Sequence, residues 1–409
     1  METKNTPVLL LTGYLGSGKT TLLNNILTNE RGIRFAVIVN DIGEVNIDAA
    51  LIQKGGIVGG KDSGDLVALQ NGCICCTLKM DLVEQLTQLV ETKAFDYIVI
   101  EASGICEPEP IAQTICSIPA MGGQYVRHGV PELDCIVTVV DALRLKSEFA
   151  CGDQLERKDL EEEDIENLII QQIEFCNIIL LNKISEVSPE EAARIKTIIR
   201  ALQPKAQIIE CDYCRVDLSA LLNTGMFDFE EVATSATWIQ QLERPVTEEE
   251  EHEAHHHHEH EHLHDDEHHK EEGHCHHHHH HHEEGEAEEY GIQTFVYYRR
   301  DPFDLNRFDY LAGKWPSNII RSKGEVYFSN NKDMCYLFEQ SGVQKKLSEA
   351  GRWLATAPKE DLRAMLESDP TLMRDWDPKY GDRMIKIVII GQNLDKAAIT
   401  SLLDSCLAK

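Results

Sequence analysis

The residues best suited to chemistry lie near the start of the chain, in GYLGSGKT at residues 13–20. This run satisfies G-x-x-x-x-G-K-[ST] and stands between an apolar strand-like run, PVLLLT, and a helical run, TLLNNIL, as a phosphate-binding loop requires. Backbone N–H groups would cradle phosphates, Lys19 would reach the terminal phosphates, and Thr20 would offer its hydroxyl to Mg²⁺. The predicted nucleotide-binding residues here are Gly13, Gly16, Ser17, Gly18, Lys19, Thr20 and Thr21.

A carboxylate is needed to hold Mg²⁺, and DYIVIEASG places Glu101 at the end of a strand-like segment. We expect Glu101 to act with Thr20 at magnesium, and Gly104 to let the backbone approach the γ-phosphate closely. In NDIGEVNID, Asp41 and Glu44 could contact Mg²⁺ or position water, and solvated loop acids are the alternative interpretation. The predicted catalytic residues are Lys19, Glu101 and Asp41.

Base recognition is expected at NKIS, residues 182–185, after the strand-like run NIILL. In an N-K-x-D element, the Asn amide and the Asp carboxylate recognise guanine, so Asn182 and Lys183 are predicted to bind the base. Ser185 replaces the Asp and cannot make paired charge-assisted contacts. Selectivity for guanine then depends on Glu186 or another acid, and we expect GTP over ATP.

Three cysteines fall within four residues in NGCICCTL, namely Cys73, Cys75 and Cys76. Three thiolates suit a soft or borderline metal such as Zn²⁺ or Cu(I) and leave a fourth coordination position open, which suits transfer better than storage. Small buried side chains and a redox role are the alternatives. A second pair, Cys211 and Cys214, forms C-x-x-C, and we expect these two cysteines to be structural.

The elements that must position these residues alternate along the first part of the chain. Apolar strand-like runs at residues 7–13, 34–40, 96–104, 134–142, 177–183 and 206–211 alternate with helical patterns that begin near Lys19, Leu82, Pro108, Glu162 and Pro189. This order predicts an α/β fold, a doubly wound and mostly parallel sheet. Later strands at 293–300, 318–328 and 384–391, with helices near 303–313 and 394–406, predict a smaller α+β domain.

The segment between these parts has an unusual composition. Residues 248–289 hold 17 Asp and Glu against one Lys, together with 18 of the 19 histidines. Such a segment cannot pack a core, so the predicted domains are 1–235 for nucleotide binding, a disordered linker at 236–289, and 290–409. Neutral imidazoles in the linker could bind transition metals weakly and in many places.

Length and charge bound the remaining possibilities. A chain of 409 residues is long enough for two cores. The net charge of −31 argues against nucleic-acid binding. No apolar run reaches the roughly 18 residues of a membrane helix, and the N-terminus does not read as a signal peptide. We expect a cytoplasmic protein whose 13 cysteines are reduced.

In this order, GYLGSGKT, CICC, EASG and NKIS resemble the CobW-like family of P-loop GTPases, the metallochaperone group that includes YjiA-type proteins and zinc-regulated GTPase metalloprotein activators. The His-rich segment and the runs KGEVYF and GDRMIKIVIIGQNLD extend the resemblance over nearly the whole chain. It implies GTP hydrolysis coupled to insertion of zinc or cobalt into a client metalloprotein. The chain departs from the family at Ser185 and at Asp41, where the family often has Glu.

We therefore expect a metallochaperone that hydrolyses GTP slowly until a homodimer partner, metal or client accelerates it. A rival of another class is a metal buffer, in which the histidine segment stores metal and the nucleotide site regulates storage. A small-molecule kinase is a third interpretation, since P-loop folds also phosphorylate. The sequence does not identify the client or separate zinc from cobalt.

Overall fold

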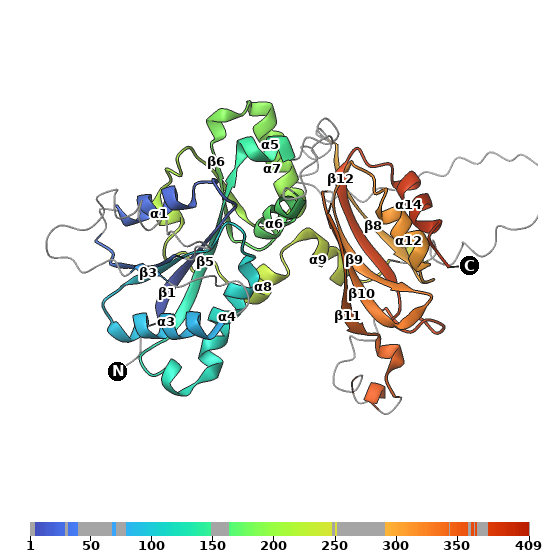
Figure 1. Ribbon diagram of the computed structural model, residues 1–409, viewed down its shortest axis with the longest axis horizontal. Coiled ribbons are helices and arrows are strands. Elements are labelled where there is room, and N and C mark those ends of the chain that lie inside the picture. The colour runs from blue at the N-terminus through green and yellow to red at the C-terminus, as the bar shows by residue number, and fades with distance from the viewer. Residues whose placement is uncertain are drawn as a thin grey trace, which may run out of the picture. The chain divides into compact units, whose positions relative to one another are not determined.

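The chain folds into two compact units, Met1–Thr237 and Trp238–Lys409 (Figure 1). The computed structural model describes residues 5–28, 32–39, 68–70, 79–148, 163–247, 250–251, 291–342, 344–358, 361–363, 365 and 375–408. Asp41, Glu44, the three cysteines of CICC and the histidine segment lie outside the described residues. The predictions made for them therefore stay predictions.

The first unit contains one sheet of seven strands in the order β3-β2-β4-β1-β5-β6-β7, with all neighbours parallel. The strands are β1 (Thr6–Thr12), β2 (Phe35–Val39), β3 (Ala68–Gln70), β4 (Tyr97–Glu101), β5 (Pro131–Asp141), β6 (Ile178–Asn182) and β7 (Gln207–Glu210). The predicted parallel α/β fold is confirmed. The three-residue β3 was not predicted, because so short a run carries no clear apolar pattern.

Helices connect these strands and cover the sheet. They are α1 (Lys19–Leu27), α3 (Lys79–Thr92), α4 (Pro108–Met121), α5 (Ala142–Glu148), α6 (Glu163–Glu174), α7 (Pro189–Leu202) and α8 (Phe229–Ala233), with short 3₁₀ turns η1 (Gly123–Tyr125), η2 (Ile184–Glu186) and η3 (Leu218–Ala220). The five predicted helices are confirmed. Helix α7 begins at Pro189, and Ser188 and Glu191 form a capping box at its start. Both features favour the start of a helix.

The core on one face of this sheet explains how the phosphate loop is supported. Leu9 and Leu11 of β1 are fully buried and cluster with Leu22 and Leu23 of α1. Because side chains alternate along a strand, Val8 and Leu10 face the opposite side and are equally buried. Burial on both faces is typical of a parallel sheet that is covered on both sides.

The second unit is a five-stranded antiparallel sheet in the order β11-β10-β9-β12-β8. It consists of β8 (Ile292–Arg299), β9 (Ile319–Phe328), β10 (Asn331–Ser341), β11 (Gln344–Arg352) and β12 (Ile385–Gln392), with α12 (Leu305–Ala312), α14 (Lys396–Asp404) and the 3₁₀ turn η5 (Leu354–Thr356). The predicted α+β domain is confirmed. Strand β11 was missed because it is a polar edge strand, QKKLSEAGR, that is mostly exposed.

The predicted linker boundary is wrong at its start. Helix α9 (Thr237–Glu243) lies at the junction of the two units, and Trp238 onward belongs to the second unit. Lys386 of β12 donates to the carbonyls of Leu242 and Arg244 at 2.8 and 2.7 Å, and Glu251 forms an ion pair with Arg300 at 2.5 Å. Composition alone misassigned Glu251, because the buried Arg300 of the second unit neutralises it.

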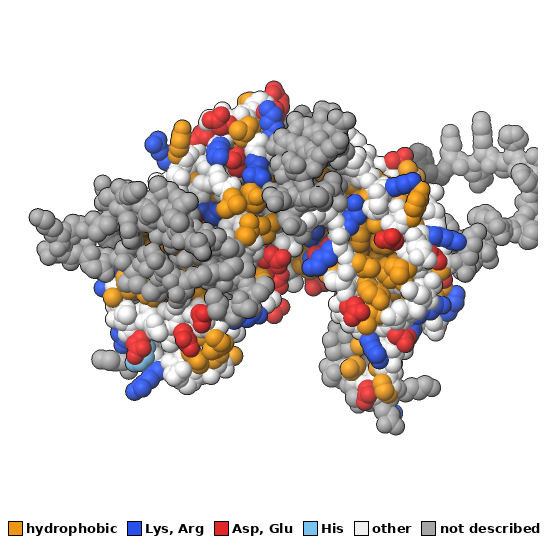
Figure 2. Space-filling view, in the orientation of Figure 1, with side chains coloured by type: hydrophobic (Ala, Val, Ile, Leu, Met, Phe, Trp, Pro, Cys, Tyr) orange, Lys and Arg blue, Asp and Glu red, His pale blue; other side chains and the backbone are white. Residues whose placement is uncertain are grey.

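Charged side chains of both signs are mixed over the face seen in Figure 2. The expectation that the chain does not bind nucleic acid rests on charge and stays a prediction. Among the described residues, no helix combines the length and the apolar composition needed to cross a bilayer.

Candidate functional site

The phosphate loop leaves β1 and enters α1 through backbone conformations that glycine favours. Gly13 has φ 132° and Gly18 has φ 116°. A Cβ on Gly13 would stand 2.2 Å from the carbonyl oxygen of Val139, and one on Gly18 would stand 2.6 Å from Nδ2 of Asn182. The loop therefore tolerates no side chain at either position. It ends where the nine-residue helix α1 begins at Lys19, and the N-terminus of a helix favours an anion.

Lys19 lies over this loop and is 8% exposed. Its Nζ donates to the carbonyls of Gly13 at 2.7 Å and Tyr14 at 3.2 Å. Both acceptors are neutral, so a phosphate oxygen would be a stronger partner for the ammonium group. The structure thus holds a positive charge at the mouth of the helix, in reach of an incoming nucleotide.

Thr20 and Glu101 meet although 81 residues separate them in sequence. The Thr20 hydroxyl donates to Glu101 Oε1 at 3.0 Å, and Glu101 is 3% exposed. Their proximity follows from the pairing of β1 with β4, in which Leu11 lies opposite Glu101. A hydroxyl and a carboxylate side by side supply the hard oxygen ligands that Mg²⁺ prefers. The two residues predicted for magnesium are therefore adjacent and chemically suited to it.

Gly104 approaches the phosphate loop itself. A Cβ on Gly104 would lie 2.7 Å from the backbone nitrogen of Leu15 and 2.8 Å from its Cδ2. Buried Gln172 of α6 fixes this turn by donating to the carbonyls of Gly104 at 3.3 Å and Cys106 at 3.1 Å. The segment after β4 is thereby packed directly against the loop.

This packing predicts the effect of Gly104→Ala. The added methyl group must displace the backbone of Leu15. We therefore expect the free energy of unfolding to fall by about 1–3 kcal/mol and nucleotide binding to weaken. Chemical denaturation and nucleotide titration measure both quantities. Gly313→Ala is the control, because its Cβ would meet nothing closer than 3.5 Å. Equal stability of the two variants would contradict the close approach.

The predicted base-binding residues lie beside the phosphate loop, at the end of β6. Asn182 Nδ2 donates to the Ser17 carbonyl at 2.8 Å, and Asn182 Oδ1 accepts from the Cys214 backbone N–H at 3.0 Å. Lys183 Nζ donates to the Gly16 carbonyl at 3.1 Å and to Asp141 Oδ2 at 2.5 Å. An amide nitrogen carries two protons, and the bond to Ser17 uses one of them. Asp141, which ends β5, was not identified from the sequence.

The second cysteine pair is part of the core. Cys211 is 5% exposed and Cys214 is fully buried, in the same cluster as α1. The hydrogen bond that the Cys214 thiol donates to Cys211, together with burial, raises the pKa of Cys214 well above its usual range, which keeps it a neutral thiol. The burial of both side chains in this cluster supports the expected structural role. Among the described residues, no three His, Cys, Asp or Glu side chains are grouped to hold a metal.

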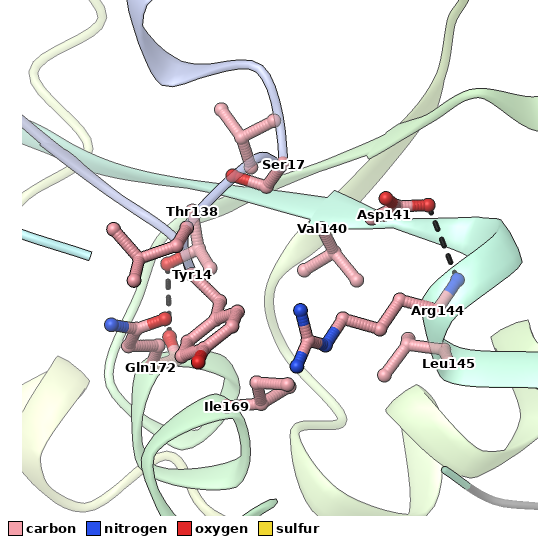
Figure 3. A pocket seen from close by; sticks show the side chains of 11 residues that line it. Tyr14, Ser17, Thr138, Val140, Asp141, Arg144, Leu145, Ile169 and Gln172 are labelled. Atoms are coloured by element: carbon pink, nitrogen blue, oxygen red, sulfur yellow. Dashed lines mark hydrogen bonds between the residues drawn. The ribbon is translucent and has the colours of Figure 1, made fainter. Parts of the chain in front are cut away.

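A small pocket lies on the other side of the loop, between β5, α5 and α6 (Figure 3). Arg144 of α5 points into it, and its Cζ lies 4.1 Å from the centre of the Tyr14 ring. This contact is a cation–π interaction that ties α5 to the phosphate loop. No sequence motif identified Arg144, because its position depends on the fold of β5 into α5.

Two family models match this chain. The CobW/HypB/UreG nucleotide-binding domain matches residues 7–210, and the C-terminal domain of the cobalamin synthesis protein cobW matches residues 292–407. The crystal structure of Zn(II)-bound YjiA GTPase from E. coli aligns with a TM-score of 0.39 at 20% identity, over 99% of this chain and 100% of that one.

Two relatives align over more than half of this chain. Zinc-regulated GTPase metalloprotein activator 1 of Dictyostelium discoideum is 33% identical over 416 residues, which cover 98% of this chain and 79% of that protein. Zinc chaperone YjiA of Escherichia coli is 31% identical over 233 residues, 56% of this chain and 64% of that protein. With both domains matched and one relative aligned almost end to end, the chain belongs to the CobW-like family of P-loop GTPases.

Proposed function

We propose that this GTPase is a metallochaperone, in which GTP binding and hydrolysis control the transfer of zinc, or cobalt, from the thiolates of Cys73, Cys75 and Cys76 to a client metalloprotein. The observation that carries the nucleotide part is the adjacency of Lys19, Thr20 and Glu101 at one edge of the sheet. The names of the relatives, zinc chaperone and zinc-regulated activator, support the metal part.

Different groups of the loop would make different contacts with the phosphates. Backbone N–H groups between Gly13 and Thr20 would hold the phosphates, and the Lys19 ammonium group would leave the loop carbonyls for the phosphate oxygens. Mg²⁺, when bound by Thr20 and Glu101, supplies positive charge that neutralises the transferred phosphoryl group. Asp41 would position the attacking water, and Gly104 would bring the segment after β4 close to the terminal phosphate.

The metal is cargo in this proposal. Three thiolates bind zinc or cobalt tightly enough to load, while an open fourth position lets a client ligand enter. We assign this reaction to the cytosol, where thiols stay reduced. We further propose that a homodimer contact, the cargo metal or the client accelerates hydrolysis.

The test is a titration of Zn²⁺ and Co²⁺ against a competing chelator, without nucleotide, with GDP and with a non-hydrolysable GTP analogue. Residues 252–289 are replaced by a Gly/Ser segment of equal length, which removes the histidines but keeps Glu250 and Glu251. This choice matters because Glu251 pairs with Arg300, which is 2% exposed. The matched variant changes Cys73, Cys75 and Cys76 to Ser.

We expect a cysteine-dependent affinity that differs about tenfold or more between nucleotide states, equivalent to roughly 1.4 kcal/mol of coupling. Equal affinity in all states, or affinity that survives loss of the three cysteines, would contradict transfer. In that case a metal buffer becomes the better explanation, provided that replacing the histidine segment removes most of the metal-binding capacity of the wild-type protein.

A further inference from the structure

Ser185 occupies the position at which an N-K-x-D element carries its carboxylate, yet a carboxylate lies against it in the structure. The Ser185 backbone N–H and hydroxyl both donate to Oδ1 of Asp212, at 3.1 and 2.9 Å. Asp212 lies 27 residues further along the chain, two residues after the end of β7. The fold therefore places the carboxylate of Asp212 next to Ser185, the position at which an N-K-x-D element has its own carboxylate.

The position of Asp212 is fixed by sheet geometry. Strands β6 and β7 are parallel neighbours, with Leu181 opposite Glu210, so the loops that follow them leave the same edge of the sheet. Ligands of doubly wound folds bind outside this carboxyl edge. NKIS and Asp212 thus share the side of the unit that carries the phosphate loop.

Hydrogen bonds also tie the Asp212 loop to the phosphate site. Asn25 of α1 donates through Nδ2 to the carbonyls of Tyr213 and Cys214, both at 3.0 Å. Asn182 joins the Cys214 N–H to the Ser17 carbonyl. These bonds hold Asp212 at a fixed position relative to the phosphate loop. A nucleotide whose phosphates bind that loop, and whose base lies beside Asn182 and Lys183, would therefore meet Asp212 at a fixed distance.

Asp212 still has acceptor capacity for a ligand. Both hydrogen bonds that its carboxylate accepts from described residues go to Oδ1, so Oδ2 keeps its lone pairs. The other nearby acid, Asp141, is already engaged by Lys183 Nζ on Oδ2 and by the Arg144 N–H on Oδ1. Glu186, considered from sequence, is exposed and its side chain makes no hydrogen bond to a described residue.

We propose that Asp212 is the residue that selects guanine, with Ser185 orienting its carboxylate. Guanine presents N1–H and a 2-amino group side by side, whereas adenine presents an acceptor at N1 and no 2-amino group. A carboxylate only accepts hydrogen bonds, so Asp212 would bind the first edge and repel the second. This assignment rests on the nucleotide-binding roles proposed for Asn182 and Lys183.

The test uses the full-length protein and three nucleotides, GTP, ATP and xanthosine triphosphate. In D212N the side chain keeps its size and an acceptor for Ser185, but it gains N–H donors that match the 2-oxo group of xanthine. We expect GTP affinity to fall roughly 10- to 100-fold, ATP affinity to stay unchanged and the preference to turn toward xanthosine triphosphate. E186Q is the matched control and should keep the preference for GTP.

A gain of xanthosine triphosphate binding cannot come from misfolding, and the melting temperature without nucleotide checks the fold independently. A second variant, S185A, removes only the hydroxyl that orients the carboxylate, and should weaken GTP about three- to tenfold. A retained GTP preference in D212N, a reversed preference in E186Q, or unchanged GTP affinity in S185A overturns the assignment while leaving the GTPase intact. A wild-type protein that binds no GTP overturns both.

Discussion

Lys19→Ala is expected to lower the rate of GTP hydrolysis by at least about 10²–10³-fold, the usual effect of removing one preorganised charge from a transition state. Its ammonium group is held within 2.7 Å of the Gly13 carbonyl at the mouth of α1. Lys183, which also donates to the loop, is already engaged with Asp141 and the Gly16 carbonyl. Single-turnover hydrolysis at saturating GTP isolates the chemical step.

Lys146→Ala is the control for loss of a lysine in the same unit. Lys146 is 46% exposed and pairs with Glu191 at 2.7 Å on the surface of α5 and α7, so its removal should leave hydrolysis unchanged. Since Lys19 also donates to two loop carbonyls, a melting curve is needed to show that the loop survives. Hydrolysis by the Lys19 variant within tenfold of wild type would refute the role proposed for this residue.

The parts of the site that the sequence predicts are those set by local motifs. The glycine pattern at 13–20 requires the positive φ angles that Gly13 and Gly18 adopt. Glu101 could be placed because strand ends of a parallel sheet meet at one edge, and Thr20 lies at that edge. Both inferences need only short-range periodicity and the general geometry of a βαβ unit.

The missed parts depend on contacts between distant segments. Asp212 reaches Ser185 only because β7 pairs with β6 in one register, which no local pattern specifies. Glu251 follows a run of glutamates and reads as linker, yet Arg300 and Tyr298 of the second unit both donate to it. Strand β11 lacks apolar alternation because most of its side chains face solvent. Tertiary partners, not propensity, determine each of these outcomes.

The second unit also contains a buried charge pair, Arg299 with Asp404, whose removal should cost much stability. Asp404 at the end of α14 accepts from Arg299 Nε at 2.7 Å, from Arg299 Nη2 at 2.9 Å and from the Tyr297 hydroxyl at 2.9 Å. The Arg299 side chain is 5% exposed, and its guanidinium group lies 4.9 Å from the centre of the Tyr297 ring. This interaction attaches α14 to β8, an edge strand whose neighbour in the described sheet is β12.

Asp404→Ala is therefore expected to destabilise the second unit by about 3–5 kcal/mol, because it leaves the buried guanidinium group without its counter-charge. All four tryptophans of the chain lie at or beyond residue 238, so tryptophan fluorescence in urea follows this unit alone. Asp333→Ala is the matched control, since Asp333 pairs with Arg383 at 3.5 Å and its side chain is 68% exposed. An exposed pair contributes at most about 1 kcal/mol. If the two variants shift the fluorescence midpoint equally, burial does not increase the contribution of the Arg299–Asp404 pair to the free energy of unfolding. Helix α14 must then be held by its apolar contacts through Ile399 and Leu403.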